Sequence, residues 1–420
     1  MSQTKYLIIG SSHGGLSALD AIRVHDEEGS ITIVSRENTN PYSPTILPYV
    51  IAGIKGAEDV DLRDPGYFEK LNATFKNDDS VTRVDPGKKT VKLDTGEDIQ
   101  YEKLLITTGA DASIPPFPGV DQVPYHVVRT LEDTKKLRSH IEKSKSAIVL
   151  GAGLIAMHTA ETLAHAGLQV TVVVRRQVSL FAYFSGDAAK MIEKVFADNN
   201  VRIATGHGVE KMSHADGVST VTLQSGEDLT ADIVVMATGV QPRIGCVEGS
   251  GIETDQGILV DNLMRTSAPD VWAAGDVAQA PDFFDQGKTI NATLPNASIQ
   301  GRIAGMDMAG DPAVKPYLGS SGLNTFNFFG HHGFSVGLGT INESTDEIEL
   351  NTTFLPSGMR YQKLVFQDNR LVGCSAINPK LDPGVMRELI QREIDLSDVM
   401  EKFANAPRET GRLLMTKLWR

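Results

Sequence analysis

The apolar and polar positions of two separate stretches follow the same order. Each stretch begins with an apolar run typical of a buried strand, passes through a glycine turn into a segment with helical spacing, and ends in a second apolar run. About 30 residues span the first stretch, the length that a parallel strand–helix–strand unit requires. The pattern predicts two dinucleotide-type half-folds, with segments at residues 5–9, 10–23 and 30–35 in the first and 146–150, 151–165 and 169–174 in the second.

Shorter apolar runs accompany these half-folds. Residues 104–110 and 233–240 each indicate a strand ending in Thr-Gly, followed by prolines that suit a chain leaving one domain for the next. Residues 266–277 indicate a strand that brings Asp276 just after Gly275. From about residue 320, alternating β-like runs lead to a helical end, which predicts a separate α+β domain.

Composition narrows the function classes. The 420 residues carry a formal net charge of −13, which repels phosphate backbones and anionic bilayers, so nucleic acid and membrane surfaces are not expected partners. No apolar stretch approaches the ~20 residues of a spanning helix, and the first residues show no signal-peptide pattern, so we expect a cytoplasmic protein. The chain has only two cysteines, Cys246 and Cys374, in no CxxC or CxxxxC arrangement, so a disulfide framework, a thiolate-ligated cluster and a dithiol redox centre all lack their ligands. Any redox chemistry must therefore come from a bound cofactor.

The first glycine turn has the chemistry of a dinucleotide site. Gly10-x-Ser12-x-x-Gly15 departs from the G-x-G-x-x-G pattern at its second glycine, but serine is small enough for a pyrophosphate to approach the backbone. Glu37 lies 22 residues past Gly15, where a carboxylate accepts hydrogen bonds from a ribose. Glu37 can equally be a solvated loop acid.

The second turn, Gly151-x-Gly153-x-x-Ala156, keeps the first two glycines and has alanine at the helix-packing position. The strand that follows ends in Arg175 and Arg176 and lacks the carboxylate that binds the diol of NAD. Two guanidinium groups suit a 2′-phosphate, which a carboxylate would repel, so the residues favour NADPH without excluding NADH. The alternative interpretation is a solvated strand end.

The order of these motifs resembles the FAD-dependent pyridine nucleotide oxidoreductases with two dinucleotide-binding domains, over most of the chain. Near members are the ferredoxin and rubredoxin reductases, the NADH oxidase and coenzyme A-disulfide reductase group, and the flavin domain of assimilatory nitrite reductase. The resemblance implies an α/β fold with two Rossmann-like dinucleotide-binding domains, for FAD and NAD(P)H, and a C-terminal α+β interface domain. The implied boundaries are 1–117 and 246–319 for a split FAD domain, 118–245 for the NAD(P)H domain and 320–420 for the interface domain.

The resemblance also implies the cofactor-binding residues. Those of the FAD site are Gly10, Ser12, His13, Gly14, Gly15, Glu37, Thr108, Gly109, Arg129, Gly275, Asp276 and Ala297. Those of the second dinucleotide site are Gly151, Gly153, Leu154, Ile155, Arg175, Arg176 and Gly239. No residue is predicted to be a catalytic group or a metal ligand.

Two positions depart from the family pattern. Thr45 occupies the place of the single redox cysteine of the NADH oxidase and coenzyme A-disulfide reductase group. A threonine hydroxyl forms no thiolate or mixed disulfide, so those reactions lose their nucleophile. His158 stands where the family usually has glutamate, and it is either an acid near the flavin or, the interpretation we favour, a packing residue.

The resemblance and the departures together predict a flavin enzyme that transfers electrons. It would pass electrons between NAD(P)H and a one-electron iron–sulfur protein, in either direction, alone or as the flavin subunit of a larger complex. The alternatives are an oxidase or disulfide reductase, which Thr45 disfavours, and a non-catalytic flavoprotein similar to apoptosis-inducing factor. A homo-oligomer or a hetero-complex is compatible with the tail, where residues 385–394 and 412–420 indicate helices that pack in the core or dock a partner.

Overall fold

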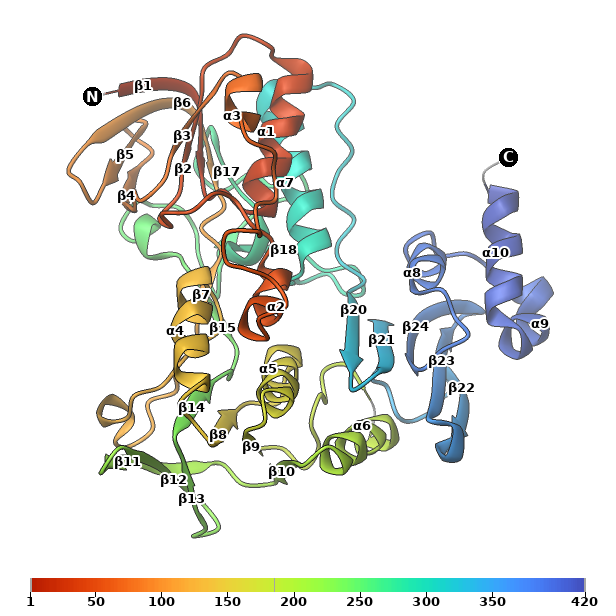
Figure 1. Cartoon of the computed structure of the whole chain (residues 1–420). Helices are drawn as coiled ribbons and strands as arrows, with labels where there is room; N and C mark the ends of the chain where they lie inside the picture. Colours follow the sequence, from red (N-terminus) through yellow and green to blue (C-terminus); the bar gives the residue numbers. More distant parts are fainter. Residues whose placement is uncertain (1, 185, 419–420) are drawn as a thin grey trace. The chain divides into compact units, whose positions relative to one another are not determined.

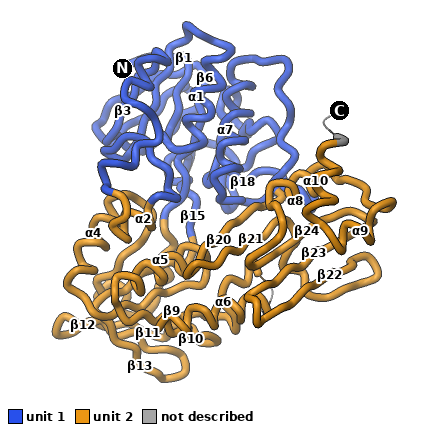
Figure 2. Tube along the Cα trace, turned by 45° about the vertical axis from the view of Figure 1, so that its right-hand side comes forward, with its two compact units in different colours: residues 1–46, 56–111, 240–320 blue, residues 47–55, 112–239, 321–420 orange. Residues whose placement is uncertain are grey.

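The computed structural model describes residues 2–184 and 186–418, which group into two compact units (Figure 2). Unit 1 comprises Met1–Ile46, Gly56–Asp111 and Val240–Ser320, and unit 2 comprises Leu47–Lys55, Ala112–Gly239 and Ser321–Arg420. The segments predicted for FAD lie mostly in unit 1, whereas those predicted for NAD(P)H and for the interface domain lie mostly in unit 2. The three-part domain division therefore stays a prediction.

Unit 1 is built on a seven-stranded sheet in the order β3-β2-β1-β6-β5-β4, with β17 paired to β6 (Figure 1). β1, β2, β3, β6 and β17 run parallel, whereas β5 is antiparallel to both β4 and β6. The strands are β1 (Ser2–Ile9), β2 (Ile31–Val34), β3 (Ala73–Lys76), β4 (Val81–Asp85), β5 (Thr90–Leu93), β6 (Asp98–Ile106) and β17 (Val271–Ala273).

Helices α1 (His13–His25) and α7 (Leu294–Ala309) pack closely against each other in unit 1 (Figure 1). A Cβ atom on Gly301 would lie 2.1 Å from the carbonyl oxygen of Gly14, and one on Gly305 would lie 2.5 Å from that of Ala18. Only glycine permits this approach. The other elements of the unit are α3 (Tyr67–Lys70), β16 (Ile258–Leu259), β18 (Ala278–Pro281) and β19 (Lys288–Thr289).

Unit 1 has a core of apolar strands covered on both faces, as parallel sheets require. Residues 6–9 of β1 and 104–106 of β6 are buried, and they pair in register along the middle of the sheet. The run of consecutive apolar residues in the sequence reflects this burial on both faces.

Unit 2 contains a second parallel sheet, in the order β10-β9-β8-β14. Its strands and helices are β8 (Ser146–Leu150), α5 (Leu154–His165), β9 (Gln169–Val174), α6 (Gly186–Asp198), β10 (Val201–Thr205) and β14 (Ile233–Met236). Both strand–turn–helix units that the sequence predicts are present, and the predicted α/β fold with two Rossmann-like sheets is confirmed. Also in this unit are α2 (Leu47–Ile51), α4 (Leu131–Ile141), β11 (Val209–Ala215), β12 (Val218–Leu223) and β13 (Asp228–Ala231).

The C-terminal part of unit 2 is an antiparallel sheet in the order β20-β21-β24-β23-β22, followed by three helices. The β-like runs expected at residues 361–366 and 370–374 fall in β23 and β24. The elements are β20 (Leu323–Phe328), β21 (His331–Gly337), β22 (Ile348–Leu355), β23 (Arg360–Gln367), β24 (Arg370–Ile377), α8 (Pro383–Gln391), α9 (Met400–Asn405) and α10 (Pro407–Leu418). Short strands β7 (Ala110–Ala112) and β15 (Val240–Pro242) lie where the chain passes between units.

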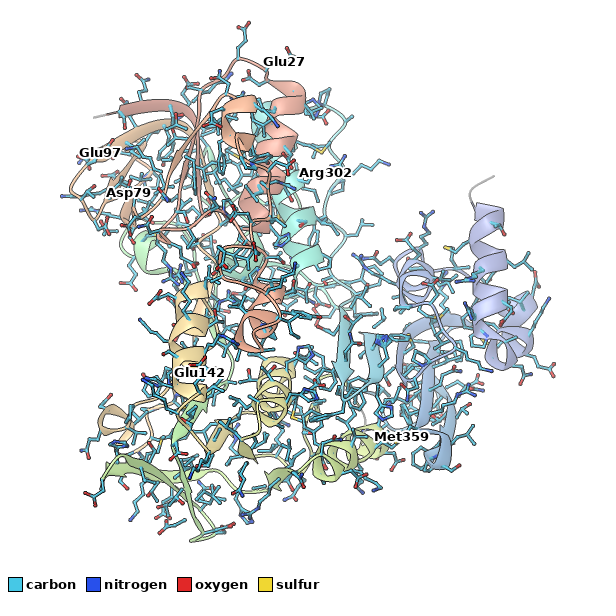
Figure 3. All side chains as sticks on the ribbon, viewed as in Figure 1. Glu27, Asp79, Glu97, Glu142, Arg302 and Met359 are labelled. Carbon is cyan, nitrogen blue, oxygen red and sulfur yellow. The ribbon has the colours of Figure 1, made fainter. Side chains whose placement is uncertain are left out.

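Charged side chains such as Glu27 and Glu142 lie exposed on their units (Figure 3). Across residues 2–184 and 186–418, no helix has both the length and the apolar character of a membrane span.

Candidate functional site

The first glycine turn connects β1 to α1 and is packed against β6. Gly10 has φ +108°, and a Cβ atom there would lie 2.2 Å from the carbonyl oxygen of Thr107. A Cβ on Gly15 would lie 2.0 Å from the carbonyl oxygen of Gly10. Ser12 is the exposed N-cap residue, so its small side chain stands at the open side of the turn. The outer two glycines are thus required by packing, and Ser12 leaves the approach to the backbone unobstructed.

The N-termini of α1 and α5 differ from that of α4. Thr130 and Asp133 cap α4 in a reciprocal capping box, and two acidic residues occupy its first turn. In α1 and α5 no side chain caps the helix and no acidic residue lies in the first turn. The first amide groups of a helix need an acceptor, and the helix dipole makes that end attractive to anions. The two helices that follow the glycine turns therefore fit phosphate groups.

Three predicted residues lie around the start of α1. A Cβ on Gly275, whose φ is +80°, would lie 3.5 Å from the side chain of Ala297, and one on Gly14 would lie 3.5 Å from the Ala297 carbonyl oxygen. The Gly275 amide donates a hydrogen bond of 2.8 Å to the Gln300 side chain in α7. Asp276 follows in a 3₁₀ turn, Gly275–Val277, and not in a strand as the sequence indicated. Unit 1 thus brings the first glycine turn and the Gly275–Asp276 segment together.

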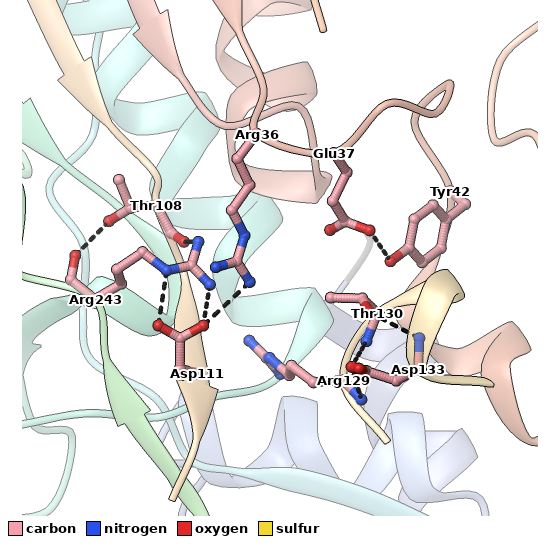
Figure 4. A network of polar contacts seen from close by, with 9 residues as sticks. All are labelled: Arg36, Glu37, Tyr42, Thr108, Asp111, Arg129, Thr130, Asp133 and Arg243. Atoms are coloured by element: carbon pink, nitrogen blue, oxygen red, sulfur yellow. Dashed lines mark hydrogen bonds and ion pairs between the residues drawn. The ribbon is translucent and has the colours of Figure 1, made fainter. Parts of the chain in front are cut away.

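The predicted ribose acceptor, Glu37, has a partner within its own loop. Its carboxylate accepts a hydrogen bond of 2.7 Å from the Tyr42 hydroxyl (Figure 4). This bond orients the carboxylate, and a carboxylate can accept further hydrogen bonds at its oxygens. Its assignment to the ribose stays a prediction.

A second polar network in unit 1 was not predicted. Asp111 forms an ion pair with Arg36, at 3.1 Å, and accepts a hydrogen bond from the Nε of Arg243, at 2.9 Å (Figure 4). The Arg243 guanidinium lowers the pKa of Asp111 most, and Arg36 lowers it further. Arg243 also donates to the Thr108 carbonyl at 2.9 Å and accepts from the Thr108 hydroxyl at 2.8 Å, which fixes the Thr108–Gly109 turn. The partners are far apart in sequence, so no local motif reveals them.

Thr45 belongs to a chain of hydroxyl groups that leads to α1. Its hydroxyl lies 2.9 Å from that of Ser43, and the Ser43 hydroxyl lies 3.1 Å from Nε2 of His13. Burial lowers the pKa of His13, and the charge of Arg63 lowers it further, which keeps the imidazole neutral at pH 7. The predicted position of a redox thiol is therefore a neutral hydrogen-bonded hydroxyl.

The second glycine turn, in unit 2, borders open space. Gly151 has φ +132°, and a Cβ there would lie 2.1 Å from the Ala237 carbonyl oxygen. In contrast, a Cβ on Gly153 or on Gly239, whose φ is +120°, would meet no atom within 4 Å. Leu154 begins α5, and Ile155 beside it is exposed although apolar. An open, glycine-lined helix start with an exposed isoleucine fits a nucleotide at this turn.

Arg175 and Arg176 are exposed at the end of β9, after the buried Val174. Within residues 2–184 and 186–418 neither arginine forms an ion pair, and their charges are not neutralised by an acidic neighbour. The Arg176 guanidinium lies over the ring of Phe181, with 3.8 Å between Cζ and the ring centroid. Two cationic groups beside the open turn fit a phosphate or an adenine ring.

Two further residues of the prediction lie elsewhere in unit 2. Arg129 lies in unit 2, where its amide donates a hydrogen bond of 3.3 Å to the Asp133 carboxylate of the α4 capping box, and its assignment to FAD stays a prediction. His158 stacks on Phe326, with ring centroids 4.9 Å apart and an angle of 15° between the rings. Burial lowers the pKa of His158 to about 4, so it is neutral at pH 7 and is suited to packing. In the described part of the chain, no three or more His, Cys, Asp or Glu side chains form a group that could hold a metal.

The chain is similar to known proteins over most of its length. Residues 4–301 match the family model described as pyridine nucleotide-disulphide oxidoreductase. The chain is 45% identical, over 100% of its length and 99% of the relative's, to the NADH-dependent phenylglyoxylate dehydrogenase subunit epsilon of Aromatoleum evansii. It is 30% identical to an NADH oxidase of Methanocaldococcus jannaschii, over 88% of this chain and 87% of the relative. The solved structure of a NAD-dependent persulfide reductase from A. fulgidus superimposes with a TM-score of 0.85 at 26% identity, over 94% of this chain and 78% of the other.

Proposed function

The chain belongs to the pyridine nucleotide-disulphide oxidoreductase family, and we propose that it passes electrons from NAD(P)H to a separate iron–sulfur protein or subunit. Family membership makes it an oxidoreductase and implies FAD and NAD(P)H as its cofactors. Family membership does not identify the electron acceptor, the direction of electron transfer in the cell or the preferred nucleotide. These three points belong to the proposal.

The observation that carries the proposal is the absence of a usable thiol among the described residues. Thr45 supplies a hydroxyl at the position predicted to correspond to the redox cysteine, and Cys246 and Cys374 are free and buried. Burial raises the pKa of the Cys246 thiol to about 11 and raises the pKa of the Cys374 thiol as well. A thiol in that state is a poor nucleophile, because the thiolate is the reactive form. Electrons that enter this chain are therefore not held on a thiol of the described residues, and we propose that they pass from the flavin to a separate acceptor.

The residues of unit 1 fit FAD. The uncapped start of α1 would receive the pyrophosphate, and Asp276 would accept hydrogen bonds from the ribityl or pyrophosphate region. FAD, when bound, supplies the conversion between two-electron chemistry with a nicotinamide and one-electron transfer to a metal centre. The close contact between α1 and α7 holds the glycine turn and the Gly275–Asp276 segment in place for this role.

The nucleotide is proposed to bind at the second turn with a preference for NADPH. Arg175 and Arg176 are exposed cations without acidic partners in the described chain, and Val174 precedes them where a carboxylate would select NADH. The relative at 45% identity is named as NADH-dependent, so the preference is open to a direct test. We expect kcat/KM to favour NADPH over NADH, and Arg175→Ala to lower the NADPH value about tenfold while leaving the NADH value within twofold. Equal values for both nucleotides in the wild type would overturn the preference.

An iron–sulfur partner is proposed because residues 2–184 and 186–418 contain neither a group of side chains that could hold a metal nor a reactive thiol to receive electrons. The same relative is named as one subunit of a dehydrogenase, which supports a role as the pyridine-nucleotide module of a larger complex. In that setting electrons can also run from the dehydrogenase to NAD(P)+. A docking role for α10 stays a prediction, and Trp419 and Arg420 of the predicted docking segment lie outside the described residues.

The competing function is an oxidase, since one relative carries the name NADH oxidase. The two functions differ in what reoxidises the flavin. We expect the FAD-loaded protein to reduce a one-electron dye, ferricyanide, at least 100-fold faster than it consumes oxygen at saturating NADPH. Oxygen consumption at a rate similar to ferricyanide reduction would favour the oxidase and contradict our proposal.

A further inference from the structure

Residues 175–184, which follow β9 (Figure 1), are hydrogen-bonded through the backbone to the second glycine turn. The Leu180 amide donates a hydrogen bond of 2.8 Å to the carbonyl of Ala152, which lies between Gly151 and Gly153. Leu180 is fully buried and has φ +51°, an uncommon conformation for a branched side chain. The hydrogen bond and the burial of Leu180 hold this segment beside the turn.

A second bond holds the same loop from the opposite side. The Ser179 amide donates 2.7 Å to the Glu193 carboxylate in α6, and Ser179 is buried. The amides of Tyr183 and Phe184 both donate to the Leu180 carbonyl, at 2.8 and 3.0 Å. Phe181 lies between these anchors, so its position is fixed by its neighbours although the residue is 41% exposed.

Phe181 and Arg176 form a stacked pair at the surface. The distance of 3.8 Å between the Arg176 Cζ atom and the ring centroid is a van der Waals contact, well within the ~6 Å range of cation–π attraction. A free arginine side chain loses conformational entropy when it binds a ligand. Because the Phe181 ring already restricts the Arg176 side chain, less entropy is lost on binding. One face of the guanidinium lies on Phe181, which leaves the opposite face for a planar ligand.

We propose that Phe181 is a positioning residue, which holds Arg176 flat as a platform for the adenine ring of the nucleotide, while Arg175 contacts the 2′-phosphate. This inference rests on the proposed binding of NAD(P)H in unit 2. Guanidinium groups stack on aromatic planes, and adenine presents such a plane in both NADH and NADPH. The two arginines then have different tasks: Arg176 binds what the nucleotides share, and Arg175 binds the group in which they differ.

The test measures binding to the FAD-loaded protein by isothermal titration calorimetry with two probes, 5′-ADP and 2′,5′-ADP. Phe181→Ala should raise Kd for both probes by the same factor, about two- to fivefold, as expected for an exposed cation–π contact. Phe181→Tyr keeps the aromatic face and should bind both probes as the wild type does, whereas Phe181→Leu keeps apolar volume and should behave as the alanine variant. In turnover, Phe181→Ala should raise KM and leave kcat unchanged.

The matched control is Phe354→Ala, which removes a similarly exposed phenylalanine of unit 2 from β22. It should leave both Kd values unchanged. Unchanged binding in Phe181→Ala, or a loss confined to 2′,5′-ADP, would overturn the platform. If Arg175→Ala raises Kd for both probes by the same factor, the proposed preference for NADPH is wrong. The role of Phe181 is still tested independently, by whether Phe181→Ala raises both Kd values. The FAD content and Tm of each variant show whether it folds. If Phe181→Ala does not fold, the Kd values of Phe181→Leu and Phe181→Tyr are compared instead.

Discussion

The contact between α1 and α7 predicts a specific effect of Gly301→Ala on FAD binding. The new Cβ atom would lie 2.1 Å from the Gly14 carbonyl oxygen, whereas ordinary contacts are 3.4–4 Å, so the helices must separate by more than 1 Å. Gly14 lies in the first turn of α1, and its displacement moves the amides that are proposed to bind the pyrophosphate. Overpacking of this kind costs about 1–3 kcal/mol.

If the free energy of FAD binding is reduced by this amount, Kd for FAD rises about 5- to 150-fold. The assay is titration of the FAD-free protein with FAD, followed by flavin fluorescence, together with Tm of the loaded protein. Gly245→Ala is the control, because it adds a Cβ atom in the same unit where nothing lies within 4 Å. A Gly301→Ala variant that matches Gly245→Ala in both Kd and Tm would refute the claim that this helix contact supports the glycine turn.

Three further outcomes follow from the structure. Asp276→Asn should weaken FAD binding about tenfold or more, because an amide replaces a charged acceptor, and a variant that keeps FAD at wild-type affinity would remove Asp276 from the site. Burial lowers the pKa of the Lys363 ammonium from 10.5 to about 8 in the folded chain. Between pH 8 and pH 10.5 the unfolded chain therefore binds more protons than the folded chain, and the free energy of unfolding rises with pH by at most about 3 kcal/mol. Lys363→Met should lack the corresponding rise of Tm with pH, and a variant whose curve matches that of the wild type would contradict the burial argument. His158→Phe should keep ferricyanide turnover and its pH profile, since the neutral ring only stacks on Phe326, whereas a tenfold loss of kcat would show a chemical role.

Local patterns predicted most of the fold. The strand–turn–helix units at β1–α1 and β8–α5 follow from apolar runs and glycine positions within about 30 residues, so the sequence contains all of the signal. The resemblance to a two-domain flavin family is confirmed for the same reason, because its motifs are short and ordered. The position of Asp276 is an exception, since β17 ends at Ala273 and a 3₁₀ turn, not a strand, carries the carboxylate.

Contacts between distant segments could not be predicted in this way. Asp111 meets Arg243 across 132 positions of the chain, and nothing near either residue signals the pair. The hydroxyl chain that leads from Thr45 to His13, and the stacking of Arg176 on Phe181, are likewise set by how loops fold back onto the glycine turns. The sequence identified which side chains carry charge, but only the fold shows which of them are already paired.

The central claim is that electrons pass to an external one-electron acceptor without a thiol. The most direct measurement is stopped-flow reoxidation of the NADPH-reduced, FAD-loaded protein by a [2Fe–2S] ferredoxin, in the wild type and in a Cys246→Ala/Cys374→Ala variant. We predict equal rates in the two proteins, and rates well above those with air-saturated buffer alone. A variant that NADPH reduces normally but that cannot reduce the ferredoxin, or a wild type that oxygen reoxidises faster than the ferredoxin does, would contradict the account.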